Sequence, residues 1–239
     1  FDAFADRVAE VIDKTVNVDR LLELCTVEFS GEQTEGVICS GNRKIAIARD
    51  EAFNFMYREN VEALKRAGEV VFFSPLHDKR LPDADLVYFP GGYPELHLPE
   101  LAANEGMRQA VRKYCETGGR VLAECGGMMY LCDTITSDDG KVYPMAGVLK
   151  QGATMEQMKL KLGYREVRVN GQRIRGHEFH YSRILPGHEK IPVIGTIYNA
   201  KDMVVDTPVY TYKNVLASYI HFYWGECGID HFLMLMSQK

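Results

Sequence analysis

The chain has 239 residues, of which 46% are hydrophobic and 26% charged, and this composition excludes disordered and collagen-like proteins. A formal net charge of −5 disfavours a nucleic-acid groove built on positive potential. No apolar run is long enough to span a membrane, and the N-terminus has no signal-peptide pattern. The six cysteines are irregularly spaced, which favours reduced thiols and a cytoplasmic protein. Since the sequence does not begin with methionine, we expect it to be a piece of a longer chain.

Residues 1–28 form the first predicted unit. Apolar residues recur in an acidic context up to about Thr26, which predicts a helix, and a second short helix is expected at Asp19–Cys25. Residues 29–42 are polar and contain glycine, so we expect a linker there. Residues 43–239 then form the main predicted domain.

From residue 43 onward, strand and helix patterns alternate. Helices are expected from the apolar spacing of Phe53–Leu64 and of Met107–Cys115, with Gly68 ending the first of them. This alternation predicts an α/β fold with a mainly parallel sheet flanked by helices. The expected strands, all read as buried, are Lys44–Ala48, Glu69–Phe73, Leu86–Phe89 and Arg120–Ala123.

The second half of the chain is richer in β signal. Tyr164–Val169 and Gln172–Phe179 flank Asn170-Gly171, a dipeptide typical of a type I′ hairpin turn. We therefore expect this hairpin to form an added β layer. Further strands are expected at Pro192–Tyr198 and Val215–Tyr223, before a last helix at residues 229–236.

Cys125 lies where a predicted strand meets a predicted helix. The strand runs into Glu124-Cys125-Gly126-Gly127, and Met128, Leu131, Cys132 and Ile135 then share one expected helix face. A side chain at such a turn is held exposed at the carboxyl edge of a parallel sheet, in the manner of a nucleophile elbow. A helix N-terminus should also favour the thiolate. The alternative is a buried core cysteine before a glycine turn.

The loop after the strand Leu86–Phe89 reads Pro90-Gly91-Gly92. Such a backbone can present N–H groups without interference from side chains, and loops at this edge of an α/β sheet bind ligands. A plain turn is the alternative.

A cysteine nucleophile needs a base, and His221 in the apolar segment 217–222 is the best candidate, although a structural histidine fits equally well. His177 and His180 lie three residues apart in a predicted strand and should point to opposite faces, so we expect no metal site there.

Five motifs in the same order resemble one known family, the C-terminal glutamine amidotransferase domain of cobyrinic acid a,c-diamide synthases. The resemblance covers the chain from about Arg43, and Phe1–Cys25 is similar to the last helices of that family's N-terminal ATP-binding domain. The motifs are ARDEAFNF at 48–55, FPGGYPEL at 89–96, AECGG at 123–127, GHEFHYS at 176–182 and SYIH at 218–221.

The resemblance implies a class I amidotransferase, flavodoxin-like fold with Cys125 attacking glutamine and His221 moving protons. Backbone N–H groups at Gly91, Gly92 and Gly126 would hold the oxyanion, and ammonia would amidate the a- and c-acetate carboxylates of cobyrinate. The resemblance also implies a set of residues that face the acceptor: His177, Glu178, His180, Tyr181 and Ser182.

The resemblance also implies partners. We expect no cofactor in this chain, because it lacks the GxxxxGK[ST] phosphate loop; ATP and magnesium are expected in the N-terminal domain. Glutamine, a cobyrinate-type tetrapyrrole and that ATP-binding domain are the expected partners, with no nucleic acid or membrane. A homodimer is compatible with the resemblance.

One departure keeps alternatives open. Tyr223 stands where many class I enzymes have a glutamate that orients the histidine. A catalytically silent docking module is therefore a second hypothesis, and the same chemistry on hydrogenobyrinate or nickel sirohydrochlorin is a third. Cysteine-elbow hydrolases and deglycases share the scaffold but lack the GHEFHYS and ARDEAFNF motifs.

Overall fold

The structure is a computed structural model that describes residues 1–27, 42–225 and 229–236, except for the side chains of residues 231 and 234. The chain divides into two compact units, Phe1–Val37 and Ile38–Lys239. In the first unit, the helices α1 (Asp2–Thr15) and α2 (Val18–Cys25) confirm the predicted helices, and none of their residues is buried. The predicted linker at 29–42 lies almost wholly outside the described residues.

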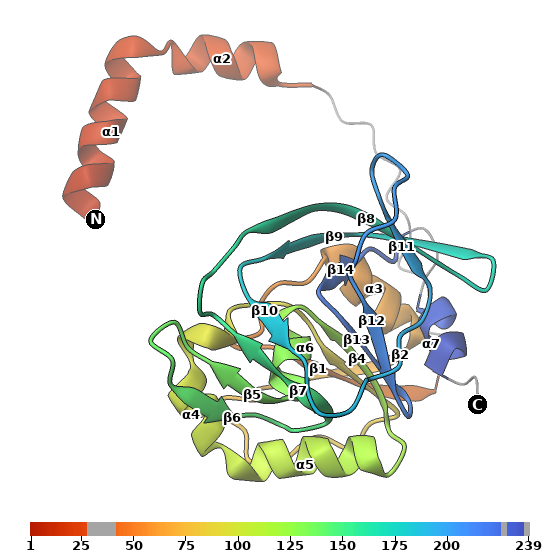
Figure 1. The fold of residues 1–239 in the computed structure, drawn as a ribbon. Coiled ribbons are helices and arrows are strands. Elements are labelled where there is room, and N and C mark those ends of the chain that lie inside the picture. The colour runs from red at the N-terminus through yellow and green to blue at the C-terminus, as the bar shows by residue number, and fades with distance from the viewer. Residues whose placement is uncertain (28–41, 226–228, 237–239) are drawn as a thin grey trace. The chain divides into compact units, whose positions relative to one another are not determined.

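A six-stranded sheet forms the centre of the second unit, in the order β12-β13-β4-β3-β1-β2 (Figure 1). All neighbouring strands are parallel except β12, which pairs with β13 in antiparallel fashion, so the predicted mainly parallel sheet is confirmed. The strands are β1 (Arg43–Ala48), β2 (Gly68–Phe73), β3 (Leu86–Phe89), β4 (Arg120–Glu124), β12 (Val209–Tyr212) and β13 (Val215–Ser218).

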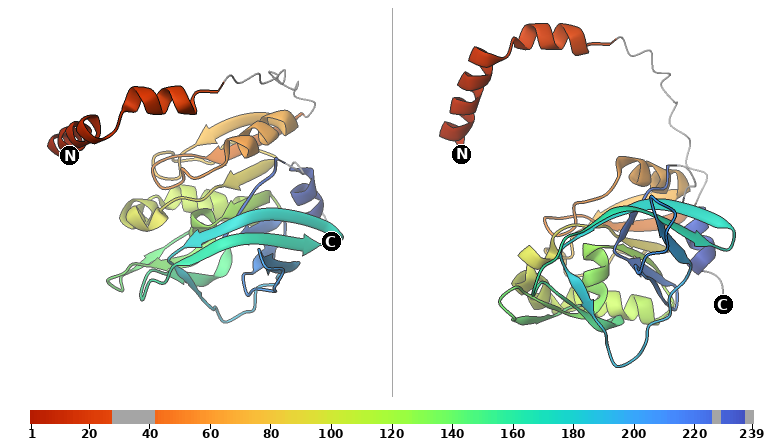
Figure 2. Two further views of the ribbon diagram at one scale, coloured as in Figure 1. Left: turned by 90° about the horizontal axis from the view of Figure 1, so that it is seen from above. Right: turned by 45° about the horizontal axis from the view of Figure 1, so that its top comes forward.

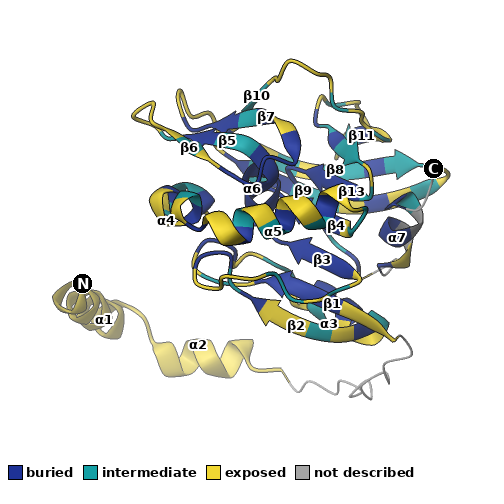
Figure 3. Cartoon of the chain, turned by 90° about the horizontal axis from the view of Figure 1, so that it is seen from below, coloured by how far each residue is buried: buried dark blue, intermediate teal, exposed yellow. Residues whose placement is uncertain are grey.

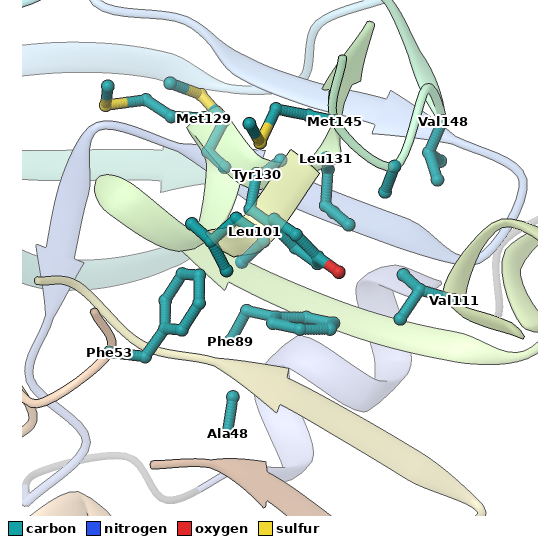
Figure 4. Close-up of a cluster of buried hydrophobic side chains, with 14 of the residues drawn as sticks. Ala48, Phe53, Phe89, Leu101, Val111, Met129, Tyr130, Leu131, Met145 and Val148 are labelled. Atoms are coloured by element: carbon teal, nitrogen blue, oxygen red, sulfur yellow. The ribbon is translucent and has the colours of Figure 1, made fainter. Parts of the chain in front are cut away.

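Apolar side chains cover both faces of this sheet. Along β1, Ile45 and Ile47 belong to one buried cluster and Ala46 and Ala48 to the other, because successive side chains of a strand point to opposite faces. Figure 4 shows the second cluster, in which Phe89 lies near Phe53 and Tyr130. The helical segments are α3 (Arg58–Ala67), η1 (Pro94–Leu96), α4 (Leu98–Ala103), α5 (Glu105–Glu116), α6 (Gly126–Leu131) and α7 (Asp230–Met236).

Two smaller sheets complete the unit, and one of them is the added β layer that the hairpin predicted. In that sheet, of order β11-β8-β9-β14, the long strands β8 and β9 lie side by side (Figure 2). Asn170 and Gly171 join them with φ angles of 49° and 75°, as a type I′ turn requires. The strands are β11 (Thr196–Asn199), β8 (Lys161–Val169), β9 (Gln172–His180) and β14 (Ile220–Phe222). The other sheet, of order β10-β7-β5-β6, contains β10 (Arg183–Leu185), β7 (Leu149–Thr154), β5 (Cys132–Thr136) and β6 (Val142–Pro144).

Two of the predicted helices, those expected at 53–64 and after Cys125, are shorter in the structure than predicted. The first begins only at Arg58, because the Asp50 carboxylate accepts hydrogen bonds from the N–H groups of Ala52 and Phe53 and holds this segment as a turn. The helix after Cys125 ends at Leu131, and Cys132 begins strand β5 instead. The apolar residues of β5 satisfy a helical spacing by coincidence, since they are buried in a sheet.

Three strand predictions also need correction. The segment 69–73 is an edge strand and not a buried one, with Val71 and Phe72 exposed to 41% and 40% (Figure 3). The strand predicted at 192–198 begins at Thr196. The segment predicted as one strand at 215–223 is two, which separate at Tyr219 and enter different sheets.

Candidate active site

Cys125 stands at the turn between β4 and α6, as the sequence predicted. Its backbone has φ 45° and ψ −108°, a conformation that is strained for a residue with a side chain. Its N–H donates to the Ser218 carbonyl at 2.7 Å, and its carbonyl accepts from the Met129 N–H at 3.0 Å. These bonds fix the turn on both sides, so the sulfur is held at the end of β4.

The glycine after Cys125 lets a second loop approach. A Cβ added to Gly126 would lie 2.7 Å from Cδ of Pro94 and 2.9 Å from the carbonyl oxygen of Gly92. The loop after β3 and the turn after β4 are therefore in direct contact beside the sulfur. Among the described residues, the N–H group of Gly92 donates to no protein acceptor, and the N–H group of Gly126 is directed at the Cys125 sulfur, so both donors lie at this point.

A cavity of about 310 Å³ opens next to Cys125. It brings together most of the residues that the sequence singled out, from β4, β9, β14 and the loop after β3. Glu178 lines a neighbouring cavity instead, while Gly91 lies against His221 and Gly126 against Gly92 without lining the cavity themselves. The lining residues are Phe55, Gly92, Tyr93, Glu95, Cys125, Met129, His177, Phe179, His180, Tyr181, Ser182 and His221.

The His221 ring is fixed by packing. It is edge-on to Phe55 at a centroid distance of 4.6 Å and stacks on His177 at 4.8 Å. A Cβ added to Gly91 would lie 2.2 Å from Cε1 of His221, so the ring rests directly on the backbone of residue 91.

No hydrogen bond joins Cys125 to His221, the base expected from the sequence, within the described part of the chain. The Cys125 thiol points to the carbonyl oxygen of Phe179 at 3.7 Å. Nδ1 of His221 is buried and has no partner among the described residues. The two side chains share the cavity, and the imidazole has a nitrogen free to accept a proton.

Burial favours the neutral forms of the Cys125 thiol and the His221 imidazole. It raises the pKa of the Cys125 thiol to about 12, and the nearby Glu95 carboxylate acts in the same direction. Burial likewise lowers the pKa of His221 to about 3, with a smaller effect from His177 and His180. The N–H of Gly126, at the start of α6, lowers the thiol pKa in the direction expected of a helix N-terminus, but loss of hydration outweighs it in the free chain.

Glu178 and His180 form a buried hydrogen-bonded corner. The Glu178 carboxylate accepts hydrogen bonds from Arg165 at 2.7 Å and Thr207 at 2.9 Å, and it contacts Nε2 of His180 at 2.8 Å. The His180 ring stacks on Tyr219 at a centroid distance of 3.6 Å. These contacts hold β9 against the point where β13 and β14 separate.

The remaining residues of segment 176–182 differ in their surroundings. The Ser182 hydroxyl is 2.9 Å from the Tyr219 hydroxyl, so it belongs to the same corner. Nδ1 of His177 is 2.6 Å from the Tyr57 hydroxyl, and Tyr181 is 41% exposed at the cavity edge. Tyr223, at the position of the absent glutamate, packs edge-on against Tyr57 at 5.5 Å.

Sequence reasoning gave no role to Glu124, the residue before the cysteine. Its fully buried carboxyl group accepts from the Tyr88 hydroxyl at 2.8 Å and the Phe222 N–H at 3.2 Å, and burial raises its pKa to about 8. The signal was a charged residue inside an apolar strand, which is rare without a partner. Phe55 and Glu95, which also line the cavity, stand in the motifs at 48–55 and 89–96, but neither was assigned a role.

The cysteines other than Cys125 lie away from the cavity where they are described. Cys115 and Cys132 are buried, Cys25 is exposed, and Cys39 and Cys227 lie outside the described residues. In the ranges that the structure describes, no three His, Cys, Asp or Glu residues are grouped to hold a metal ion. No helix within those ranges is long and apolar enough to cross a membrane.

Solved structures share this fold. A structure described as a glutamine amidotransferase matches with a TM-score of 0.53 at 22% identity, over 81% of this chain and 99% of its own. PurLQS from Thermotoga maritima matches with a TM-score of 0.52 at 19% identity, over 75% of this chain and 87% of its own. The chain therefore has the fold of glutamine amidotransferases.

Curated relatives are more similar in sequence. The cobyrinate a,c-diamide synthase of Salmonella typhimurium is 34% identical over 232 residues, which cover 91% of this chain and 50% of the relative. The hydrogenobyrinate a,c-diamide synthase of Pseudomonas aeruginosa is 37% identical over 228 residues, with coverages of 93% and 50%. The chain thus spans about half the length of these relatives.

A comparison with protein families matches residues 44–227, the span that contains all of β1 but its first residue, the Cys125 turn, the β8–β9 hairpin and His221. Together with the cavity and the fold, this match means that the chain belongs to the CobB/CobQ-like glutamine amidotransferase domain family.

Proposed function

We propose that the chain is the glutamine-hydrolysing part of an ATP-dependent a,c-diamide synthase that acts on cobyrinate. The observation that carries the proposal is that Cys125, at the strained turn after β4, lines one cavity with His221. The names of the relatives support the reaction and the acceptor.

The proposed reaction begins from a neutral thiol and a neutral imidazole. The Cys125 sulfur attacks the amide carbon of glutamine while the thiol proton passes to His221. The oxyanion that forms is bound by the N–H groups of Gly92 and Gly126. Collapse of this intermediate breaks the C–N bond, and ammonia leaves with the proton from His221. Water then hydrolyses the thioester, which gives glutamate and restores the thiol.

We assign the acceptor carboxylates and ATP mainly to the other half of the protein. The relatives are about twice as long as this chain, and α1 and α2 have amphipathic sequences with no buried residue. Both facts support a partner domain that binds ATP and magnesium. Ammonia would pass from the cavity to a carboxylate activated there.

The acceptor-side role of segment 176–182 divides between two groups of residues. Glu178, His180 and Ser182 use their polar atoms within the buried corner, so their proposed role is to shape the segment. Tyr181 is exposed and His177 lines the cavity, so these two are the proposed contacts with acceptor or ammonia.

A second acceptor has specific support. The Pseudomonas aeruginosa relative is named for hydrogenobyrinate and is as similar to this chain as those named for cobyrinate. Both acceptors should therefore be assayed with the intact protein, and the preferred one is that with the higher kcat/KM.

The nucleophile is tested by Cys125→Ala in the intact protein. We expect loss of glutamine-dependent amidation but normal amidation with free ammonia, because only the glutaminase step needs the sulfur. Cys115→Ala is the matched control, since it removes another buried thiol with a pKa raised to about 12 by burial. Glutamine use by Cys125→Ala would contradict the assignment of the nucleophile, whereas a wild-type protein that uses free ammonia but no glutamine would favour a silent docking module.

A further inference from the structure

Glu95 is carried to the cavity by η1, the short helix Pro94–Leu96. The Pro94 ring rests on Gly126, where a Cβ would be only 2.7 Å from Cδ of the proline. The position of Glu95 is thus tied to the turn that holds Cys125. Neither residue can shift far without the other.

The Glu95 carboxylate has no ionic partner in the described structure. Of the described residues that line the cavity it is the only carboxylate, and no lysine or arginine accompanies it. No hydrogen bond or ion pair joins it to another described side chain, and burial raises its pKa. Its own backbone N–H donates to it, but a partly buried carboxylate without an ionic partner is unfavourable, so an incoming cation would be stabilised here.

Glu95 also lies close enough to the nucleophile to affect it. Its charge is the largest contribution after burial to the raised pKa of the Cys125 thiol. A cation that pairs with Glu95 would therefore make the thiol easier to deprotonate.

Glutamine brings such a cation. Its α-ammonium nitrogen lies about 5 Å from the amide carbon along an extended side chain, given single bonds of about 1.5 Å. With the amide carbon at the Cys125 sulfur, the ammonium group remains within a cavity of about 310 Å³. The charged end of the substrate then needs an anionic partner, and Glu95 can provide it.

We propose that Glu95 binds the α-ammonium group of glutamine and selects glutamine over amides that lack it. This inference rests on the proposed function, since it takes glutamine as the amide donor. Glu95 then acts twice: it holds the substrate, and its neutralisation by the ammonium group removes one obstacle to the deprotonation of Cys125. The Cys125 thiol is therefore deprotonated more easily with glutamine bound than with an amide that lacks the ammonium group.

The test compares glutamine with glutaramate, which has a hydrogen in place of the α-ammonium group. The intact protein is assayed as wild type, as Glu95→Gln and as Glu100→Gln, an exposed matched control on α4. We expect the wild type and the control to prefer glutamine by at least about 10-fold in kcat/KM, the effect of one hydrogen bond to a charged group. Glu95→Gln should lose most of that preference, and its kcat/KM for glutaramate should be at least that of wild type, because the variant no longer places a negative charge near the Cys125 thiol.

Glu95→Asp distinguishes loss of the charge from a folding defect at this position. It keeps the carboxylate and should therefore retain part of the preference for glutamine. Undiminished preference for glutamine in Glu95→Gln would overturn the assignment of Glu95 and leave the proposed function intact. Glutamine hydrolysis that survives Cys125→Ala would instead overturn the assignment of the nucleophile, and this inference with it.

Discussion

The orientation of the His221 ring is explained by the packing of its neighbours. Phe55 and His177 contact the imidazole on two sides, and the backbone of Gly91 lies directly against Cε1. His177 is itself held by the Tyr57 hydroxyl, which is 2.6 Å from its Nδ1. Packing thus takes the place of the glutamate that is absent at Tyr223, and the ring keeps a free nitrogen for the proton.

Gly91→Ala tests this arrangement. The new methyl group would begin 2.2 Å from Cε1 of His221, so the ring must move. We expect kcat with glutamine to fall about 100-fold, the effect of displacing a catalytic group by about 1 Å. Amidation driven by free ammonia should be unchanged, because it does not use the imidazole. Both rates are measured in the intact protein.

Gly106→Ala is the control, because it adds the same methyl group in α5, away from the cavity, where the nearest atom is 3.3 Å away. Full glutamine turnover by Gly91→Ala would show that His221 is not held by this contact.

The sequence could identify Cys125 because its signal is local: an apolar strand, two glycines and a helix within a dozen residues. It could not identify Phe55 and Glu95 as cavity residues, because each reaches the site through the packing of its loop against distant segments. The effect of burial on the thiol pKa could not be predicted for a related reason, since burial depends on the whole fold.

At the level of elements, the break between β13 and β14 determines where His221 lies, because it takes β14 out of the central sheet and into the sheet of the hairpin. Ser218 helps to break the strand, because its hydroxyl accepts from the Ile220 N–H at 3.2 Å and its carbonyl accepts from Cys125. Tyr219 is then held by His180 and Ser182. Apolar residues continue through the break, so the sequence pattern is the same for one strand or two. The hairpin, by contrast, was predictable because Asn170-Gly171 specifies its turn locally.

Gly171→Ala tests the hairpin as a structural element. Residue 171 has φ 75°, and a Cβ there would meet no atom within 4 Å, so the cost is backbone strain alone. We expect the free energy of unfolding to fall by about 1 kcal/mol. Glutaminase kinetics should not change, because the turn does not line the cavity.

Chemical denaturation measures that free energy, and Gly171→Asn provides the comparison, since asparagine tolerates a positive φ better than alanine. Equal losses for alanine and asparagine would argue against backbone strain as the cause.

For the whole molecule, the buried carboxyl groups of Glu124 and Glu178 should make the free energy of unfolding depend on pH in opposite directions. Burial raises the pKa of Glu124 from 4.5 to about 8, so between these values the unfolded chain ionises first and stability falls as pH rises. For Glu178, burial opposes ionisation, but His180, Thr207, Arg165 and Lys161 lower the pKa from 4.5 to about 2. Its contribution is complete above pH 4.5 and is lost as the pH falls toward 2.

We therefore expect Glu124→Gln to remove a decline in stability of up to about 1.4 kcal/mol per pH unit between pH 4.5 and 8. Glu178→Gln should lower stability by about 3 kcal/mol at neutral pH and flatten the acid limb of the curve, because Arg165 loses its buried partner. Urea unfolding from pH 3 to 9 measures both effects. Parallel curves for all three proteins would rule out this account.

The two proposed catalytic side chains belong to different sheets. Cys125 follows β4 of the six-stranded sheet, whereas His221 lies on β14, which pairs with β9 of the hairpin. The alignment of sulfur and imidazole is therefore a relation between two bodies joined at Tyr219, and a small rotation of one sheet against the other changes it while both sheets stay intact. In mechanical terms the site is a joint: a displacement of β9 would carry β14 and the imidazole with it while the sulfur stays with the central sheet, so a partner bound at the hairpin would change the proposed glutaminase step without entering the cavity.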